Sequence, residues 1–244
     1  MRGRRVIGDM AILTPDVYEV VSRYSLLEGL LPDECRDFVA HGRFRQVQQG
    51  AYFFHQDEPA NLFYILISGQ IKLTQLTPDG NQVILHYFGP GDGFGIIVVL
   101  GQMAYPASAY ALEDCTALSW DRETTQALMR KYPQIALNGM EIVAQRFAML
   151  QKRYRELATQ RVEQRVAFTL LRLVRQFGKR TKDGVLIDIS LSRQDLGEMA
   201  GTNLYNVSRI LRKWEKKGIV RIGRQQVALC QPHELVVIAE GVSR

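Results

Sequence analysis

The sequence predicts an α+β chain: an antiparallel barrel or sandwich of short strands, a long helix, and a C-terminal helix-turn-helix unit with a β-hairpin. Three observations predict this order. Short apolar runs bounded by turn residues recur through residues 50–120, as in antiparallel β domains. Apolar residues then keep a seven-residue repeat through residues 136–157. A short helix, a glycine turn and a basic second helix follow within residues 191–222.

Two short helices are expected ahead of the strands. Thr14-Pro15-Asp16 is typical of an N-cap followed by proline in the first turn, which predicts a helix to about Tyr24. Leu31-Pro32-Asp33-Glu34 begins the second helix, with Phe38 and Val39 as its expected buried positions. The segment from Met1 to Leu13 leaves two alternatives open, disorder or contact with a second subunit.

Six strands are expected between Gly50 and Trp120. Each apolar or alternating run is bounded by a turn signal such as Ser68-Gly69 or Thr77-Pro78-Asp79-Gly80. Strands at intervals of about 8–12 residues favour an antiparallel barrel or sandwich. The expected strands are Tyr52–Phe54, Phe63–Ile67, Ile71–Leu76, Val83–Phe88, Ala107–Ala111 and Ala117–Trp120.

A long helix is expected from Pro133 onward. Its apolar residues are spaced alternately by four and three positions, which makes a strict heptad over about three repeats. A seam this narrow suits a two-stranded coiled coil, so we expect a homodimer. The alternative, in which the stripe packs on the chain's own strands, stays open. The seam residues are Ala136, Met140, Val143, Phe147, Leu150, Tyr154 and Leu157.

The segment 191–222 predicts a helix-turn-helix. Ser192 is the expected N-cap of a short helix, Gly201 permits a tight turn, and Thr202 or Asn203 caps the second helix. One face of that second helix is apolar and the rest of it is polar and basic. The apolar face is Val207, Ile210, Leu211 and Trp214, and the polar remainder includes Tyr205, Asn206, Ser208, Arg209, Arg212 and Lys213.

The polar side of the second helix and the hairpin after it predict binding to double-stranded DNA. A helix of this kind fits the major groove, which is about 12 Å wide. Gly218 ends the helix, and Ile219–Ile222 and Gln226–Leu229 form a small wing around Gly223-Arg224. An ordinary helical hairpin with a solvated charged face is the alternative. The ordered succession of helix, turn, helix and basic wing favours DNA.

The distribution of charge agrees with a polyanionic partner. The net charge is +6, and arginine and lysine recur from Thr159 to the end but are scarce from Val47 to Leu118. The three cysteines are too scattered for a disulfide framework or a zinc site, which predicts a cytoplasmic protein. They are Cys35, Cys115 and Cys230.

Several classes of protein are excluded by the patterns that the sequence lacks. It holds no P-loop, no nucleophile elbow, no metal-ligand spacing and no paired carboxylates near a histidine, so we do not expect an enzyme. The N-terminus lacks the apolar core of a signal peptide. The longest apolar run, Ile96–Leu100, is far shorter than the roughly 20 residues of a membrane span, so no membrane partner is expected.

From about residue 25 onward the chain resembles the Crp/Fnr family of bacterial transcription regulators. The resemblance rests on the segments GAYFFHQDEPANLFYILISGQIKL, LTPDGNQVIL, FGPGDGFG, SRQDLGEMAG and VSRIL. It implies a jelly-roll-like antiparallel β-roll that resembles cyclic-nucleotide-binding domains, a dimerisation helix, and a winged helix-turn-helix. It also implies a pseudo-palindromic operator bound by a homodimer, and RNA polymerase as a further partner.

With this resemblance the chain divides into four expected parts. They are an N-terminal arm and helix over 1–24, a β-roll sensor domain over 25–132, a dimerisation helix over 133–158, and a DNA-binding domain over 159–244. The boundary between Leu157 and Val162 is expected to be a continuous helical hinge. The rival class, a β-roll regulatory subunit that binds a partner protein, would have no helix-turn-helix.

On the DNA side, Ser208 and Arg209 stand where the family carries base-reading residues, and Arg209 can bond guanine bidentately. Leu204 and Tyr205 replace the family's arginine-glutamate or valine-glutamate pair, so we predict a half-site different from TGTGA and TTGAT. Asn206 either reads adenine or contacts phosphate. The expected DNA-binding residues are Arg193, Thr202, Asn203, Tyr205, Asn206, Ser208, Arg209 and Lys213.

On the sensor side, the resemblance places an effector pocket but removes two effectors. Ile96 replaces the glutamate that binds the ribose of cyclic AMP, and no arginine stands beside Ser108 for the cyclic phosphate. An iron–sulfur cluster is not expected, because Cys35 alone lies near the N-terminus. The expected pocket residues are His86, Phe94, Gly95, Ile96, Ser108, Arg146, Phe147, Leu150 and Gln151.

Three effector hypotheses remain, and haem is the one that we favour from the sequence. The first is haem for NO, CO or redox sensing, with His86 as a ligand and Met103, His55 or a residue of the N-terminal arm as the second. The second is an organic anion such as a 2-oxo acid, held by Arg146. The third is no small ligand. In each case Phe147 and Leu150 are the expected coupling residues between pocket and dimer seam.

Overall fold

The computed structural model describes residues 15–96, 101 and 103–241. They divide into two compact units, each described here by itself. The first holds residues up to Asn81 and Leu85–Ala148, and the second holds Gln82–Ile84 and the residues from Met149 onward. The expected arm from Met1 to Leu13 lies outside the described residues. Among the described helices, none has the apolar run needed to cross a bilayer.

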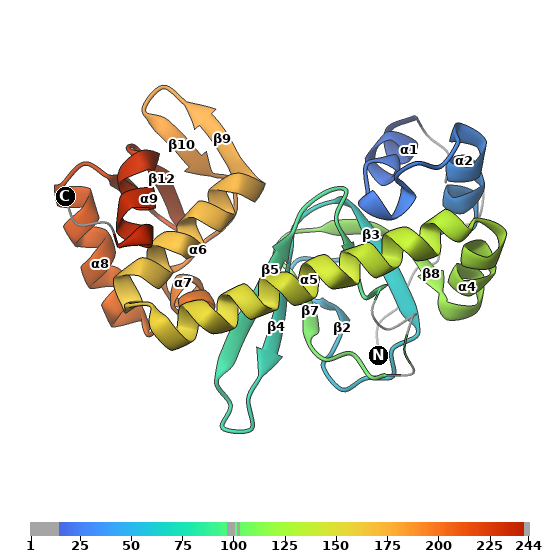
Figure 1. The fold of residues 1–244 in the computed structure, drawn as a ribbon, viewed down its shortest axis with the longest axis horizontal. Helices are drawn as coiled ribbons and strands as arrows, with labels where there is room; N and C mark the ends of the chain where they lie inside the picture. The colour runs from blue at the N-terminus through green and yellow to red at the C-terminus, as the bar shows by residue number, and fades with distance from the viewer. Residues whose placement is uncertain (1–14, 97–100, 102, 242–244) are drawn as a thin grey trace. The chain divides into compact units, whose positions relative to one another are not determined.

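The first unit gathers its short helices around the start of the long helix α5, as Figure 1 shows for α1, α2 and α4. The helices are α1 (Pro15–Ser22), a 3-10 turn (Ser25–Leu27), α2 (Pro32–Ala40) and α4 (Arg122–Lys131). The two predicted helices are confirmed, although α1 ends at Ser22 and not near Tyr24. Helix α4 was not predicted; its N-cap is Asp121, whose carboxylate accepts a hydrogen bond from the backbone N–H of Thr124 at 2.8 Å.

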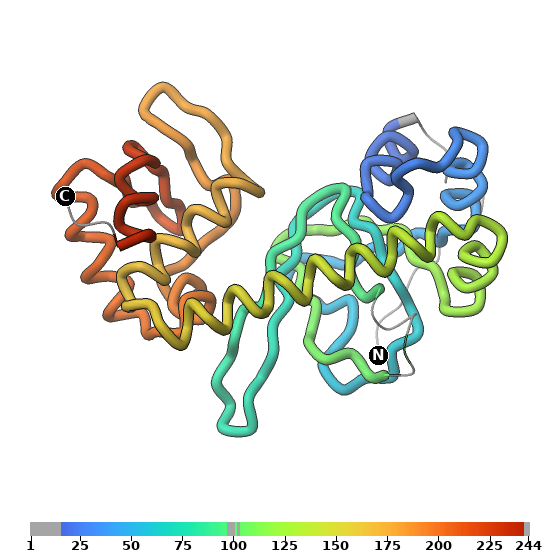
Figure 2. The backbone as a smooth tube through the Cα atoms, viewed as in Figure 1, coloured from blue at the N-terminus to red at the C-terminus, as the bar shows by residue number. Residues whose placement is uncertain are grey.

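The strands of the first unit form two four-stranded sheets. One sheet has the order β1 (Arg43–Val47), β8 (Cys115–Asp121), β3 (Leu62–Ser68) and β6 (Gly93–Phe94). The other has the order β2 (Tyr52–Phe54), β7 (Ser108–Ala111), β4 (Ile71–Leu76) and β5 (Gln82–Phe88), and Figure 2 follows β4 and β5 as one hairpin. The antiparallel β-roll and its six expected strands are confirmed. Strands β1 and β6 were not predicted, because RFRQV is polar and β6 is only two residues long.

Neighbouring residues of β3 face two different cores. Tyr64 and Leu66 point into the inner core between the two sheets, whereas Phe63 and Ile65 point into the outer core beneath the helices. This is the alternation of a strand buried on both faces. The inner core is Phe53, Phe54, Ala60, Tyr64, Leu66, Ile71, Phe88, Phe94, Tyr105, Ala109, Ala111, Cys115 and Ala117. The outer core includes Tyr24, Phe38, Val39, Phe63, Ile65, Ile96, Leu118, Trp120, Ile135 and Ile142.

The long helix α5 (Pro133–Thr159) buries only one side of its first half. Ile135 and Ile142 belong to the outer core, and the amide of Asn138 donates to the Leu26 and Glu28 carbonyls at 2.9 and 2.8 Å. The predicted seam lies on another side. Its exposed fractions are 59% for Met140, 59% for Phe147, 62% for Leu150, 74% for Tyr154 and 54% for Leu157, so most of the stripe does not pack on the chain's own strands.

The second unit contains the predicted helix-turn-helix and wing. Its elements are α6 (Val162–Phe177), β9 (Gly178–Thr181), β10 (Gly184–Ile187), α7 (Arg193–Ala200), α8 (Leu204–Lys216), β11 (Val220–Gly223), β12 (Gln226–Leu229) and α9 (Pro232–Glu240). The strands make one sheet in the order β11, β12, β10, β9. The sequence-based expectations for α7, α8 and the wing are confirmed, whereas α9 was not predicted.

The predicted continuous helical hinge is wrong. Helix α5 ends at Thr159, and α6 begins at Val162 with Arg161 as an extended N-cap. The side-chain amide oxygen of Gln164 accepts from the Arg161 backbone N–H at 3.0 Å, which stabilises the new helix start. The chain therefore breaks between α5 and α6. The division between the two compact units falls earlier, between Ala148 and Met149.

Candidate nucleic-acid interface

Helix α7 and the turn after it are fixed by local bonds. The Ser192 hydroxyl accepts from the Asp195 backbone N–H at 3.0 Å, and the Asp195 carboxylate accepts from the Ser192 N–H at 2.9 Å. Gly201 ends the helix in the left-handed region at φ 64°. At Gly197 an added Cβ would lie 2.8 Å from the carbonyl oxygen of Thr202, so the turn closes tightly against the helix.

Helix α8 is capped by Asn203, which is one of the two N-caps that the sequence allowed. Its side-chain oxygen accepts from the Asn206 backbone N–H at 2.9 Å. The predicted apolar face is buried, since Val207, Ile210, Leu211 and Trp214 are each at most 7% exposed. Burying that face aims the polar face of the helix at solvent.

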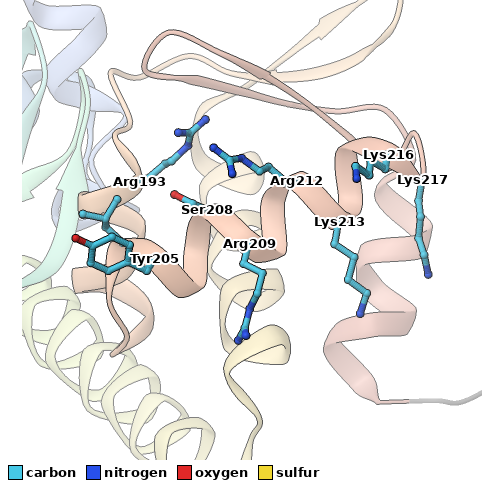
Figure 3. Close-up of a pocket in the computed structure, with 9 residues that line it drawn as sticks. Arg193, Tyr205, Ser208, Arg209, Arg212, Lys213, Lys216 and Lys217 are labelled. Atoms are coloured by element: carbon cyan, nitrogen blue, oxygen red, sulfur yellow. The ribbon is translucent and has the colours of Figure 1, made fainter.

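A shallow groove of about 830 Å³ runs along the polar face of α8. Figure 3 shows Arg209 and Lys213 leaving one side of the helix, and Ser208 and Arg212 leaving the other. Six of its nine lining residues are basic and none is acidic, so the groove favours a polyanion. The lining residues are Arg193, Leu204, Tyr205, Ser208, Arg209, Arg212, Lys213, Lys216 and Lys217.

Five of the eight predicted DNA-binding residues line this groove: Arg193, Tyr205, Ser208, Arg209 and Lys213. The other three, Thr202, Asn203 and Asn206, are not among its lining residues and instead take part in hydrogen bonds at the start of α8. Lys216 and Lys217 were missed. The cluster of lysines in KWEKKG was the signal that pointed to them.

One predicted contact residue is already paired. The Lys213 ammonium lies 3.0 Å from a carboxylate oxygen of Glu163 on α6, and the Trp214 indole N–H donates to the same oxygen at 3.0 Å. Glu163 therefore neutralises part of the charge on this side of α8. Within the described part of the chain, Arg209 has no acidic partner; its guanidinium donates to the Asn206 amide oxygen at 3.2 Å.

A second groove, of about 390 Å³, lies between α7, the start of α8 and the wing. Arg193 lines both grooves, and Arg224 and Gln225 line the second from the wing. Gln225 adopts a positive φ of 54° at the wing's tight turn. The wing thereby adds a further cation beside the basic face of α8.

Four charged residues near the end of α5 and on α6 lie close to the turn between α7 and α8. We call this set the junction network: Arg153, Glu156, Arg165 and Arg172. Glu156 is 5% exposed and its carboxylate lies 2.6 Å from the Arg172 guanidinium. Burial and the neighbouring Arg172 charge lower the pKa of Arg153 to about 10. Arg165 donates to the Ala200 and Gly201 carbonyls at 2.8 and 2.9 Å. No local sequence pattern predicts this network.

The predicted effector-pocket residues are not gathered in one pocket. Phe94 lies in the inner core, 1% exposed, with its ring centroid 5.0 Å from that of Tyr64. Ile96 lies in the outer core, because Gly95 turns the backbone at φ 83° between them. The Ser108 hydroxyl accepts from the Gln56 backbone N–H at 2.9 Å. Phe147, Leu150 and Gln151 are exposed on α5.

The two residues that were expected to bind an effector directly, His86 and Arg146, both make contacts within the first unit. His86 is half-buried on β5, with its ring centroid 4.6 Å from that of Phe88. The Arg146 guanidinium donates to the Gly93 carbonyl at 2.8 Å and lies 6.0 Å from the Phe88 centroid. Of the suggested second haem ligands, Met103 is exposed, and the His55 ring lies tilted against the Tyr52 ring with their centroids 4.3 Å apart. Among the described residues, no three His, Cys, Asp or Glu side chains are grouped to hold a metal ion.

The β-roll, the helix-turn-helix and the basic groove define a DNA-binding regulator with a sensor-type domain. Residues 44–132 match the family model of the cyclic nucleotide-binding domain, and residues 164–238 match that of the Crp-like helix-turn-helix domain. The chain belongs to the Crp/Fnr family of transcription regulators and is not an enzyme.

The chain is similar in sequence and in fold to several regulators of this family. The chain is 30% identical, over 89% of its own length and 98% of the relative's, to the cyclic AMP receptor protein of Thermus thermophilus. The solved structure of the catabolite activator protein of that organism has a TM-score of 0.53 at 30% identity, and it covers 90% of this chain and 100% of that one. FixK2 of Bradyrhizobium japonicum has a TM-score of 0.71 at 23% identity over 81% of this chain and 96% of its own, which shows the shared fold.

Proposed function

We propose that the protein binds a two-fold symmetric DNA site as a homodimer, with α8 of each subunit in the major groove, and that it regulates transcription there together with RNA polymerase. The observation that carries this proposal is the groove on α8, where six cations surround Tyr205 and Ser208 without an acidic lining residue. Cations at the rim bind phosphates, and side chains at the N-terminal end of the helix contact base edges.

The dimer is proposed from the exposed stripe on α5. Met140, Phe147, Leu150, Tyr154 and Leu157 are each more than half exposed, although they are large and apolar. Their heptad spacing suits the seam of a parallel coiled coil. A dimer of this kind would present two recognition helices about 34 Å apart, which is one turn of DNA.

The base-reading set proposed here is Tyr205, Ser208 and Arg209. Tyr205 is 78% exposed, and its ring is able to contact a thymine methyl but cannot accept from cytosine N4 as glutamate does. This supports a half-site that differs from TGTGA and TTGAT.

Selection from randomised double-stranded DNA tests the proposal. We expect an enriched inverted repeat, and we expect Arg209→Ala to lose a guanine preference at one symmetric pair of positions. Arg130→Ala is the matched control, because it removes an exposed arginine from α4 in the other unit. Absence of any enriched motif with the unmodified chain would overturn the proposal.

For the effector, the packing supports the hypothesis of no small ligand within the roll. The described residues do not fit haem, because the inner core is filled by aromatic rings in mutual contact; Phe54 and Tyr105 stack with centroids 3.7 Å apart. Haem at His86 would require this cluster to open. An organic anion at Arg146 would have to replace the bond to the Gly93 carbonyl. Cyclic AMP would meet neither an arginine beside Ser108 nor a carboxylate at Ile96.

An absorption spectrum of the purified chain, before and after addition of haem, separates these hypotheses. We expect no Soret band after removal of free haem. A Soret band that shifts with CO or NO and disappears in His86→Phe would restore the haem hypothesis. A featureless spectrum, combined with 2-oxo acids that alter DNA binding only when Arg146 is present, would instead support the organic anion.

A further inference from the structure

We propose that Asn206 does not contact the DNA bases and is a positioning residue, which holds the Arg209 guanidinium for reading guanine. This inference rests on the proposed function, since it assigns a role within the DNA-binding surface of α8. It also replaces the expectation that Asn206 reads adenine or contacts phosphate.

The geometry places Asn206 in the middle of three hydrogen-bonded side chains that run from the turn before α8 into its second turn. Its amide N–H donates to the Thr202 hydroxyl at 3.0 Å, one turn toward the helix start. Its amide oxygen accepts from the Arg209 guanidinium at 3.2 Å, one turn toward the helix end. The amide is therefore held along the helix surface by a bond at each end.

The chemistry of the partners fixes the orientation of this amide. A guanidinium has only donors, so the atom that faces Arg209 must be the oxygen, and the amino group then faces Thr202. Bidentate recognition of adenine needs the amide oxygen and the amino group to point outward together. Here the oxygen is directed at Arg209 on the same helix, and the amino group is directed at Thr202 in the turn before it.

The neutral charge of Asn206 matters as much as its position. Lys213 leaves the same side of α8 as Arg209 (Figure 3), but it is paired with the Glu163 carboxylate, which offsets its charge. The Asn206 amide orients Arg209 without neutralising it. The Arg209 guanidinium has five N–H donors and uses one of them in this bond. It therefore keeps a pair of parallel donors for guanine O6 and N7.

The test uses the full-length chain and the operator that it selects. Dissociation constants are measured for the unmodified chain, Arg209→Ala, Asn206→Ala and the double variant, on the operator and on a copy in which the guanine assigned to Arg209 is changed in both half-sites. The unmodified chain should prefer guanine by about 5-fold to 150-fold for each half-site changed, the discrimination of one bidentate contact, and the factors for the two half-sites should multiply. Arg209→Ala should abolish this preference.

Asn206→Ala should reduce the preference several-fold at that same position and leave the other positions unchanged. The double variant should behave as Arg209→Ala does. Asn206→Asp should still orient Arg209 but neutralise it, so it should weaken binding to every sequence and flatten the salt dependence. All three replacements at Asn206 and Arg209 keep the backbone N–H that Asn203 caps, and circular dichroism checks that they fold.

Two outcomes would overturn the inference. One is a loss of preference in Asn206→Ala at a base pair other than that of Arg209, which would mean that Asn206 reads a base itself. The other is an unchanged profile in Asn206→Ala. Both differ from failure of the proposed function, in which the unmodified chain selects no motif.

Discussion

The inner core of the β-roll and the junction network behind the helix-turn-helix both contain buried side chains, but they are built from opposite chemistry. Phe94 in the inner core is surrounded by the rings of Phe53, Tyr64 and Phe88, at centroid distances of 5.2, 5.0 and 5.8 Å. Glu156 in the junction network is buried with two arginines nearby.

The two regions therefore hold their shape in different ways. The stability of an apolar core depends mainly on buried volume, so neighbours relax partly around a change. A buried ion pair depends on its partner, because loss of one member leaves a charge without compensation. The first arrangement suits a stable roll, and the second fixes the orientation of a turn.

The largest effect should come from breaking the inner core. Phe94→Ala should lower the free energy of unfolding by about 4 kcal/mol, from lost burial and the cavity left behind. Urea denaturation followed by near-ultraviolet circular dichroism measures it. Added benzene should recover part of the loss, because a dry apolar cavity accepts it. A loss below about 1 kcal/mol would mean that the inner core is loosely filled.

Breaking the junction network should cost somewhat less. Glu156→Ala should lower the free energy of unfolding by about 2 kcal/mol, because it removes the carboxylate that compensates the buried Arg153 charge and the partly exposed Arg172 charge. Glu141→Ala, on the exposed side of the same helix, is the control and should stay within about 0.5 kcal/mol. Equal effects of the two replacements would contradict the assigned role of the network.

A third replacement concerns Tyr24, which carries a polar hydroxyl into the apolar outer core. Tyr24 is 8% exposed, and within the described part of the chain its hydroxyl has no hydrogen-bond partner. Burial raises the pKa of Tyr24 to about 12, from 10.0. Since the folded pKa lies above the unfolded one, its stabilising contribution is complete below pH 10 and is lost as the pH rises toward 12.

Tyr24→Phe should therefore resist alkali better than the unmodified chain. The gain in the free energy of unfolding should be about 1.4 kcal/mol at pH 11, with little difference at pH 8. Urea titrations at the two pH values measure it. A pH-independent difference would show that Tyr24 does not titrate differently in the folded state.

The smallest effect concerns a directional bond near the surface. Ser192→Ala removes the hydroxyl that caps α7 and should cost about 1 kcal/mol. Ser192→Asn, which also caps helices, should recover most of that loss. Thermal unfolding of the three proteins decides between a capping role and a role of the hydroxyl in DNA contact alone.

Features set by neighbours in the sequence could be predicted, and features set by distant contacts could not. Ser192 and Gly201 act within a few residues, so the helix-turn-helix was predictable from local signals. The junction network joins Glu156 to Arg172 and Arg165 to Gly201, and no periodicity indicates such pairs. Ile96 was placed in the pocket by resemblance, but a single glycine with positive φ turns it into the outer core.

The three bonds of Arg165 have a mechanical consequence. Its guanidinium donates to the Gln160 carbonyl, just after α5, and also to the Ala200 and Gly201 carbonyls, at the end of α7 where the turn toward α8 begins. We expect this side chain to act as a strut across the break between the helices. A rotation of the end of α5 would then be transmitted to the turn before α8, and would not be absorbed by the non-helical segment between α5 and α6.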